Sequence, residues 1–136
     1  MTLVVDASTV VAALVDSGPD GRWAERFLES EVLVAPHLLP VETANVLRRA
    51  ALVGDISADT ASLAHGDLLD LRVQLFAYEP FGPRVWELRD SLSAYDAWYV
   101  ALAESLHAPL ATLDQRLAQS PGPTCPFLTP TDRATP

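Results

Sequence analysis

The sequence predicts an α/β domain in which a parallel sheet of about four to five strands is covered by helices on both faces. Two observations point to this fold class. Short runs of β-branched and aliphatic residues alternate with longer segments whose apolar residues recur at helical spacing. The 136 residues, 49% hydrophobic and 20% charged, have the length and balance of one globular domain, which we expect to span residues 1–136.

The N-terminal half of the chain predicts two strands and four helices. Leu3–Val5 is a short aliphatic run that ends in Asp6. Gly54 is expected to stop the third helix, and Ser57 to cap the fourth. The expected elements are a strand at 3–5, a helix over 10–15, a helix around 23–28, a strand at 32–35, a helix over 41–50 and a helix from 57 to about 71.

The C-terminal half predicts the remaining strands. Pro83 stands where a proline opens a helix, and Ser93 or Ala94 begins the next one. Five of the eleven prolines lie in 121–136, so we expect an irregular proline-rich tail from about residue 120. The expected elements are a strand at 73–77, a helix through 86–88, a helix over 95–107, a strand at 109–113, a short helix from 116 and at most an edge strand at 126–129.

The composition excludes several classes of protein. All nine basic residues are arginines, so the chain lacks the lysine that a P-loop nucleotide enzyme or a Schiff-base enzyme needs. The net charge of −9 opposes nonspecific clamping onto a phosphate backbone. A single cysteine, Cys125, rules out an internal disulfide and a thiolate zinc site. Because the net charge is negative, any nucleic-acid role must use metal ions or local arginines.

The same features favour a cytoplasmic protein. One cysteine fits a reducing compartment. The N-terminal segment lacks the basic region and length of a secretory signal, and the apolar run at 10–15 is too short to span a bilayer. We therefore expect no membrane association.

Acidic residues stand within or beside apolar segments at four places, where an isolated charge is costly: Asp6, Glu42, Asp96 and Asp114. Two follow predicted strands and two lie in predicted first turns of helices, so all can converge at one sheet edge. No arginine is adjacent to Asp6 or Asp96, which makes a divalent cation the natural compensation. All-oxygen ligands suit Mg²⁺ or Mn²⁺, and such a site can activate water for attack on a phosphoryl group.

Each of these acids also has a simpler explanation. Asp6 and Asp114 can cap the helices that follow them. Glu42 and Asp96 can interact favourably with the dipoles of the helices in whose first turns they lie. Their joint placement favours a shared site over four separate structural roles.

Four segments together carry a resemblance to a known family: Val4–Ser8, Pro40–Leu47, Ser93–Ala97 and Ala111–Asp114. In their order and spacing the sequence resembles the PIN-domain ribonucleases, in particular the VapC-type toxins of bacterial toxin–antitoxin pairs. The resemblance implies a PIN-like three-layer α/β/α sandwich with Asp6, Glu42, Asp96 and Asp114 around Mg²⁺ or Mn²⁺. It implies a metal-dependent endoribonuclease toxin that cleaves specific sites in transfer or ribosomal RNA through metal-activated water.

Further residues are expected to assist these acids. The resemblance implies that Ser8 and Thr112 support the ligands by hydrogen bonds. Asn45 lies three residues after Glu42 on the same helix face and can reach the site. Arg116 follows Asp114 closely, which makes it the preferred RNA-phosphate contact. The other candidates for such contacts are Arg48, Arg49, Arg84 and Arg89, and core packing is the preferred explanation for Trp86, Tyr95, Trp98 and Tyr99.

We also expect the chain to work with partners. Its mean hydropathy of +0.17 is high for a small domain, and the segments 41–52 and 63–71 hold more apolar residues than one core-facing stripe needs. Full burial within the domain is the simpler explanation. The resemblance instead implies a homodimer and a small VapB-like antitoxin whose C-terminal segment lies near Glu42.

Two other functions remain open at the level of sequence. One is a non-catalytic acidic domain that binds a metal ion or presents its helices to a partner. The other is a different metal-dependent phosphoesterase, such as a phosphatase or a DNA nuclease, built on a similar acidic sheet edge. Metal-dependent cleavage of RNA separates the ribonuclease from both.

Overall fold

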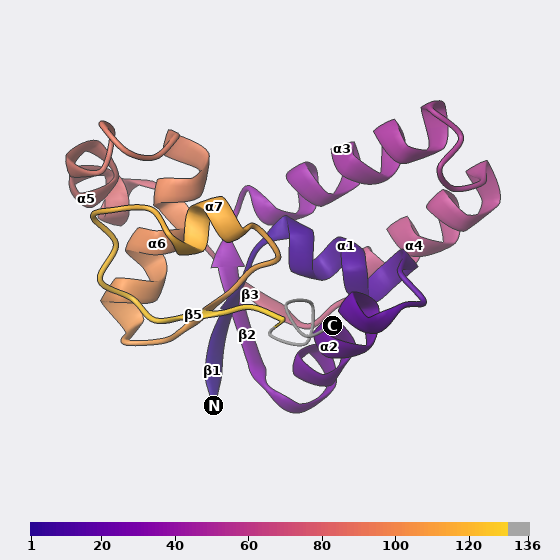
Figure 1. The fold of residues 1–136 in the computed structure, drawn as a ribbon, viewed down its shortest axis with the longest axis horizontal. Helices are drawn as coiled ribbons and strands as arrows, with labels where there is room; N and C mark the ends of the chain where they lie inside the picture. The colour runs from indigo at the N-terminus through magenta and orange to yellow at the C-terminus, as the bar shows by residue number, and fades with distance from the viewer. Residues whose placement is uncertain (131–136) are drawn as a thin grey trace.

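The computed structural model describes residues 1–130 and contains a five-stranded, fully parallel sheet with strand order β3-β2-β1-β4-β5 (Figure 1). This confirms the predicted α/β fold class. The residues 131–136 of the expected proline-rich tail lie outside the described part. The strands are β1 (Thr2–Val5), β2 (Val32–Pro36), β3 (Val73–Phe76), β4 (Leu110–Ala111) and β5 (Phe127–Leu128).

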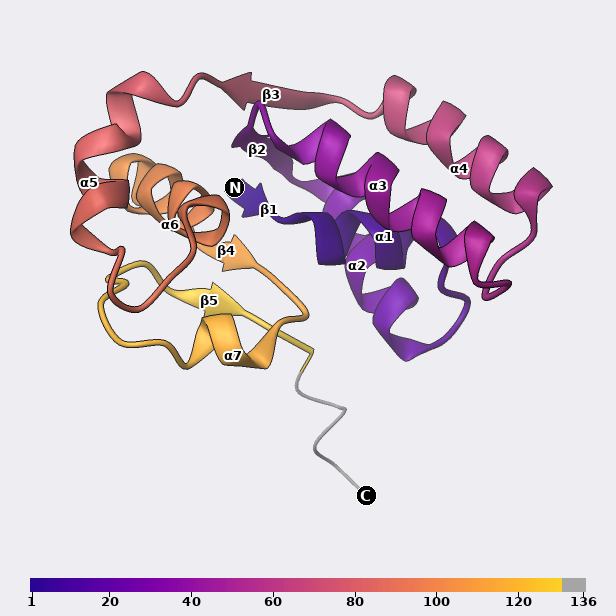
Figure 2. The same ribbon diagram turned by 90° about the horizontal axis from the view of Figure 1, so that it is seen from above.

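Helices cover both faces of the sheet. Figure 2 shows α5 and α6 on one side of the sheet. The helices α1, α2, α3 and α4 lie on the other side. The result is the predicted three-layer sandwich. The helices are α1 (Ala7–Val15), α2 (Pro19–Ser30), α3 (Leu39–Leu52), α4 (Ala58–Asp70), α5 (Gly82–Glu87), α6 (Ala94–Leu106) and α7 (Gln115–Ala118), and a single 3₁₀ turn, η1 (Glu79–Phe81), precedes α5.

Several helix ends follow the capping residues read from the sequence. Ser57 Oγ accepts a hydrogen bond from the Thr60 amide at 3.0 Å, and Ser93 Oγ accepts one from the Asp96 amide at 3.2 Å. Gly54 has a φ of +84°, a conformation that favours glycine, and it turns the chain between α3 and α4. The helix start that holds Asp96 is therefore set by local sequence.

Several elements differ in length from the prediction, and two of these differences lie beside the carboxyl ends of the central strands. Helix α1 begins at Ala7 rather than near Val10, because Asp6 caps it directly after β1. Strand β4 contains only Leu110 and Ala111, since the Thr112 side chain and the Leu113 amide after it form hydrogen bonds with Asp6 and Ser8. The expected edge strand exists as β5, which pairs with β4 in parallel.

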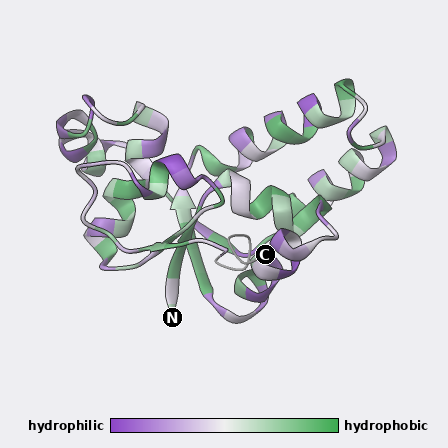
Figure 3. Ribbon diagram, in the orientation of Figure 1, coloured by the Kyte–Doolittle hydropathy of each residue, from purple (hydrophilic) through white to green (hydrophobic). Residues whose placement is uncertain are grey.

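The core lies on both faces of the sheet, and part of it packs between β1 and helix α6. Leu3, Val4 and Val5 of β1 and Val100 and Leu102 of α6 have no or almost no exposed surface. Apolar residues dominate this region in Figure 3, whereas α3 alternates between apolar and polar residues. The tightly packed centre gives the sheet edge above it a rigid base.

The two long helices α3 and α4 leave apolar side chains exposed. Val41, Leu52, Leu63 and Leu69 each retain about two thirds or more of their accessible surface. Full burial of these helices within the domain is therefore wrong, and the predicted surplus of apolar surface is present. Within residues 1–130, no helix combines the length and hydropathy needed to cross a bilayer.

Candidate active site

A cavity of about 680 Å³ opens at the carboxyl ends of the central strands, between α1, α3 and α6. Its walls bring together the four acids that the sequence singled out, along with Ser8 and Asn45. The remaining lining is largely apolar and comes from α1 and α3. The polar and charged side chains of α3 and α6 and the two strand-end acids in this lining are Asp6, Glu42, Asn45, Arg49, Asp96, Tyr99 and Asp114.

Asp6 is the most enclosed of the four acids, with 8% of its surface exposed. Its Oδ1 accepts hydrogen bonds from Ser8 Oγ at 2.7 Å and from the Thr9 amide at 3.0 Å, and its Oδ2 accepts one from Thr112 Oγ1. Burial raises the pKa of Asp6, although these hydrogen bonds oppose the shift. Asp6 thus caps α1, as the simpler explanation held, and also faces the cavity.

Thr112 and Ser8 connect Asp6 to the loop that carries Asp114. Thr112 Oγ1 accepts a hydrogen bond from the Asp114 amide at 3.0 Å, and Ser8 Oγ accepts one from the Leu113 amide at 3.0 Å. Asp114 itself caps α7 through its Oδ1. Both hydroxyl residues therefore contact Asp6 and hold the β4–α7 junction beside it.

Glu42 lies in the first turn of α3 and accepts a hydrogen bond from the hydroxyl of Tyr99, with 2.9 Å between Oη and Oε1. Burial raises the pKa of Glu42, and the charges of Asp96 and Asp6 raise it further, whereas the Tyr99 hydrogen bond lowers it. Tyr99 is 1% exposed, so its predicted core position is confirmed. Its polar role was missed. The sequence did contain a signal for this role, because Tyr99 follows Asp96 by three residues and therefore lies on the same face of the helix.

Asp96 lies in the first turn of α6 and completes the acidic group. Burial raises its pKa, the charges of Asp114 and Asp6 add to the shift, and the charge of Arg116 opposes it. Within residues 1–130, none of the four acids forms a salt bridge. No ion pair in the described part therefore neutralises these acids, and the charge of Arg116 only partly opposes their mutual repulsion.

Thr9 is a second residue that the sequence analysis overlooked. It is fully buried, and its Oγ1 donates to the Ala111 carbonyl at 2.9 Å, which ties α1 to β4. Its position, three residues after the capping Asp6 and next to Ser8, predicted only a helix start. Its long-range partner depends on the sheet order and could not be read from local spacing.

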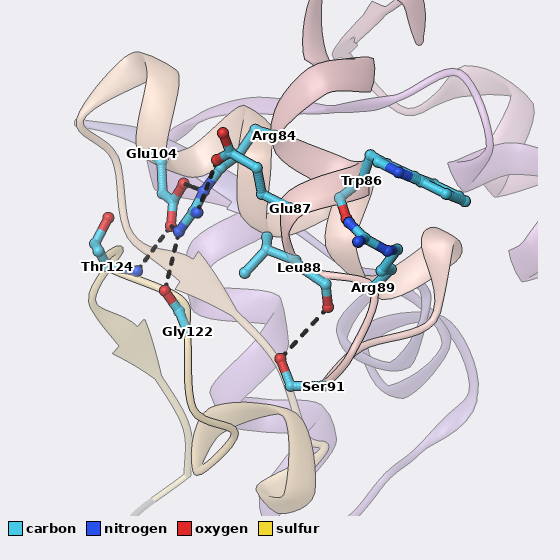
Figure 4. A network of polar contacts seen from close by, with 9 residues as sticks. All are labelled: Arg84, Trp86, Glu87, Leu88, Arg89, Ser91, Glu104, Gly122 and Thr124. Atoms are coloured by element: carbon cyan, nitrogen blue, oxygen red, sulfur yellow. Dashed lines mark hydrogen bonds and ion pairs between the residues drawn. The ribbon is translucent and has the colours of Figure 1, made fainter.

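The candidate arginines lie in different surroundings. Arg49 lines the main cavity, and Arg116 lines a smaller hollow that shares Asp96 and Asp114 with it. Arg48 lies between α3 and α4, away from the acids. Arg84 binds Glu104 and the Gly122 carbonyl, and Arg89 lies over the Trp86 ring (Figure 4). Trp86 and Tyr95 are exposed, so packing is wrong for these two, while Trp98 is partly buried against the core.

The donor set suits a hard divalent cation. Carboxylate oxygens are the ligands that Mg²⁺ and Mn²⁺ prefer, and the acids at this cavity repel one another. In the part of the chain that the structure describes, no three acidic, histidine or cysteine side chains form a close chelating group. Mg²⁺ is commonly bound through one or two carboxylates and keeps several waters, so acids spaced around one cavity fit it.

Comparisons with known proteins give a consistent picture. The PIN domain family profile matches residues 3–122. Ribonuclease VapC1 of Mycobacterium tuberculosis is 41% identical over 126 residues, covering 90% of this chain and 92% of that protein. The VapC ribonuclease Mb0985 of Mycobacterium bovis is 40% identical over 125 residues, covering 92% and 95%.

Solved structures agree on the fold. The Mycobacterium tuberculosis toxin VapC20, described as cleaving the sarcin-ricin loop, superposes with a TM-score of 0.65 at 18% identity, covering 85% of this chain and 92% of that one. VapBC2 from Rickettsia felis, solved with a promoter DNA fragment, gives a TM-score of 0.64 at 12% identity, covering 95% and 98%. With its family profile, its relatives and its fold in agreement, the chain belongs to the PIN-domain family, within the VapC ribonucleases.

Proposed function

We propose that this chain is a toxin of a toxin–antitoxin pair that cleaves transfer or ribosomal RNA at specific sites and requires Mg²⁺ or Mn²⁺. The observation that carries the metal requirement is the group of four acids at one cavity, which have no salt-bridge partner within residues 1–130. Ionised together, they would repel one another and the RNA phosphate. A divalent cation reverses the sign of the local field and makes the cavity attractive to a phosphodiester.

Each site residue has a defined part in this proposal. Asp6, Glu42, Asp96 and Asp114 supply the carboxylates among which the ion would be held, and Asn45 lines the same cavity. Ser8 and Thr112 orient Asp6 and the loop of Asp114 through their hydroxyls. Arg116 contacts RNA phosphate. When bound, the ion activates a water and stabilises the charge that develops at phosphorus.

The proposed reaction is hydrolysis of a phosphodiester. The water gives up a proton as its oxygen bonds to phosphorus, the bond between phosphorus and the 3′ oxygen breaks, and the leaving 3′ oxygen takes up a proton, so that one water is added overall. The products carry a 5′-phosphate and a 3′-hydroxyl. The ribose 2′-hydroxyl is not the nucleophile, so no cyclic phosphate forms.

Cleavage of structured RNA tests this proposal. Purified protein should cut RNA in Mg²⁺ or Mn²⁺, lose activity in EDTA, regain it when the metal is restored, and yield 5′-phosphate ends. Full activity in EDTA, from a preparation free of contaminating nuclease, would contradict the metal requirement. Metal binding without cleavage of any RNA would favour the non-catalytic domain, and cleavage of DNA alone would favour another phosphoesterase.

The partners of the proposal are an antitoxin and a second copy of the chain. The apolar side of the main cavity and the exposed residues Val41, Leu52, Leu63 and Leu69 supply surface for protein contacts. An antitoxin segment near Glu42 that carried a basic side chain would cover the cavity and neutralise the acids. We place the pair and its RNA in the cytoplasm, in keeping with the single cysteine, Cys125.

Expression in a host tests these partnerships. The chain alone should arrest growth, and co-expression with its antitoxin should restore it. Light scattering on the isolated chain should give the mass of a dimer. A monomer that is harmless without any partner would remove the toxin role, even if the nuclease activity survived.

A further inference from the structure

A second hollow, of about 310 Å³, lies on the far side of Asp96 and Asp114 from the main cavity. These two acids are lining residues of both spaces, so the hollow continues directly from the acidic site. Its other walls come from the connection between α5 and α6 and from α7. They consist of Ser91, Leu92, Ser93, Arg116, Leu117 and Ser120.

Arg116 brings a positive charge to this hollow. It is exposed on α7, and within residues 1–130 its guanidinium forms no salt bridge or hydrogen bond. Arg84, by contrast, is occupied by Glu87, Glu104 and the Gly122 carbonyl. Arg116 therefore presents a fork of N–H donors that suits a phosphate group.

Ser93 adds a second donor beside Arg116. Its Oγ accepts a hydrogen bond from the Asp96 amide, so the hydroxyl is held in place while its own proton has no acceptor among the described residues. Ser120 differs, because its hydroxyl donates to the Arg116 carbonyl at 2.7 Å. The hollow thus joins one unpaired guanidinium and one available hydroxyl proton to the two acids shared with the main cavity.

The arrangement of charge limits what the hollow can bind. A free cation would meet the positive charge of Arg116, and a free anion would meet Asp96 and Asp114. A chain of linked phosphates satisfies both sides when one phosphate lies at the metal-loaded acids and its neighbour reaches Arg116. Arg116 lines only the smaller hollow, which separates it from the phosphate at the main cavity.

We propose that this hollow is a subsite for the phosphodiester next to the scissile one, in which Arg116 binds the phosphate through its guanidinium and Ser93 donates a hydrogen bond. The inference rests on the proposed ribonuclease function and adds the direction in which the RNA leaves the acidic site. The strand passes from the main cavity over Asp96 and Asp114 toward α7.

Two substrates separate this subsite from the acidic site itself. An RNA oligonucleotide fills both spaces, whereas bis(p-nitrophenyl) phosphate has one phosphodiester and can occupy only the metal-loaded acids. Arg116→Ala should lower kcat/KM for RNA by roughly tenfold to a hundredfold, mostly through KM, and should lower hydrolysis of the small diester far less, because Arg116 reaches that site only through its charge on Asp96. Arg116→Lys should restore part of the loss, since it keeps the charge without the fork.

Arg72→Ala is the matched control. Arg72 is exposed directly before β3, at the amino end of a strand and thus at the opposite edge of the sheet from the acids. Its loss changes the net charge equally and should leave both activities unchanged. Binding of labelled RNA, followed by anisotropy across a salt series in Mn²⁺ with a noncleavable backbone, should show a slope lower by about one for Arg116→Ala only.

The outcomes distinguish the subsite from the nuclease function. Equal losses on both substrates would assign Arg116 to the acidic site and overturn the subsite. Unchanged RNA cleavage with an unchanged salt slope would overturn it as well. If the wild-type protein hydrolysed neither substrate, the proposed function would fail on its own, and the salt slope would still decide whether Arg116 binds a phosphate.

Discussion

Helix α6 carries a carboxylate near each end, and the two have opposite electrostatic surroundings. Asp96, in the first turn, faces Asp6 and Asp114, and burial together with these charges raises its pKa. Glu104, near the last turn, is also part-buried, but hydrogen bonds from Arg84 and Thr124 outweigh its burial and lower its pKa (Figure 4). The two carboxylates differ more in their charged and hydrogen-bonding partners than in their burial. This difference separates a carboxylate that serves function from one that serves the fold.

The Arg84–Glu104 contact shows what a structural role looks like in this protein. Arg84 Nε lies 2.7 Å from Glu104 Oε1, and the Thr124 amide donates to Oε2 at 2.7 Å. Through Arg84 and Gly122 the contact also holds the segment that leads to β5. Every oxygen of Glu104 is thereby used within the protein, whereas Asp96 has oxygens available to a ligand.

The largest effect should come from isosteric changes at the unpaired acids. Asp6→Asn, Asp96→Asn and Asp114→Asn should each lower RNA cleavage by about a hundredfold or more, because each removes a metal-binding charge. Asn caps helices nearly as well as Asp, so the fold should remain. Asp67→Asn, an exposed acid of α4, is the control. Retained cleavage in all three variants would mean that these acids have only structural roles at the starts of helices.

Loss of the paired contact should instead affect stability. Arg84→Ala leaves Glu104, whose side chain is 13% exposed, without its cation, and should lower the free energy of unfolding by about 2 kcal/mol. Urea denaturation measures this change, with Arg72→Ala as the charge-matched control. The metal-dependent activity of the remaining folded protein should be unaltered. A larger loss of activity than of stability would mean that the two regions are not independent.

The pH dependence of stability should have opposite signs in the two regions. In metal-free protein, the raised pKa values of Asp6, Glu42 and Asp96 mean that stability falls as pH rises above their ordinary values of 3.8 and 4.5. The lowered pKa of Glu104 contributes stability above pH 4.5 that is lost as pH falls through the lowered pKa.

Two variants separate these contributions in denaturation experiments with EDTA. Asp96→Asn should stabilise the protein at neutral pH by on the order of 1 kcal/mol and flatten the decline above pH 4. Glu104→Gln should destabilise it at neutral pH and leave that decline in place. A neutral-pH destabilisation by Asp96→Asn would show that this acid has a stabilising partner.

The smallest expected effect concerns the tyrosine that joins α6 to Glu42. Tyr99→Phe removes the hydrogen bond to Glu42 without changing the buried ring, and should weaken Mn²⁺ binding by roughly threefold to tenfold. Tyr95→Phe, an exposed tyrosine of the same helix, should change nothing. Equal Mn²⁺ binding by the two variants would mean that Tyr99 contributes only to core packing.

The sequence predicted the architecture because its signals are local. The run Leu3–Val5 before Asp6, the capping serines 57 and 93, and Gly54 each act within a few residues. The convergence of Asp6 and Asp114 followed from their positions after strands of a parallel sheet, whose carboxyl ends share one edge. The hydrogen bond between Tyr99 and Glu42 joins residues 57 positions apart, so it depends on how α3 and α6 pack.

The same reasoning explains which arginine assignments failed. No residue near Arg84 in the sequence indicates that it pairs with Glu104, which lies 20 residues away on another helix. Arg84 therefore stayed among the candidate phosphate contacts. Arg116 was favoured because it is two residues from Asp114, and that local relation survives folding. Exposure of Trp86 was missed because the spacing of a short helix does not specify which side meets the core.

Calorimetric titration of Mn²⁺ into the purified chain tests most directly whether the unpaired acids form a metal site. The wild-type protein and Asp67→Asn should bind Mn²⁺ with the same affinity, and the double variant Asp96→Asn/Asp114→Asn should lose that binding while remaining folded. Mn²⁺ binding that is unchanged in the double variant would contradict the account, because the cation would then be held elsewhere.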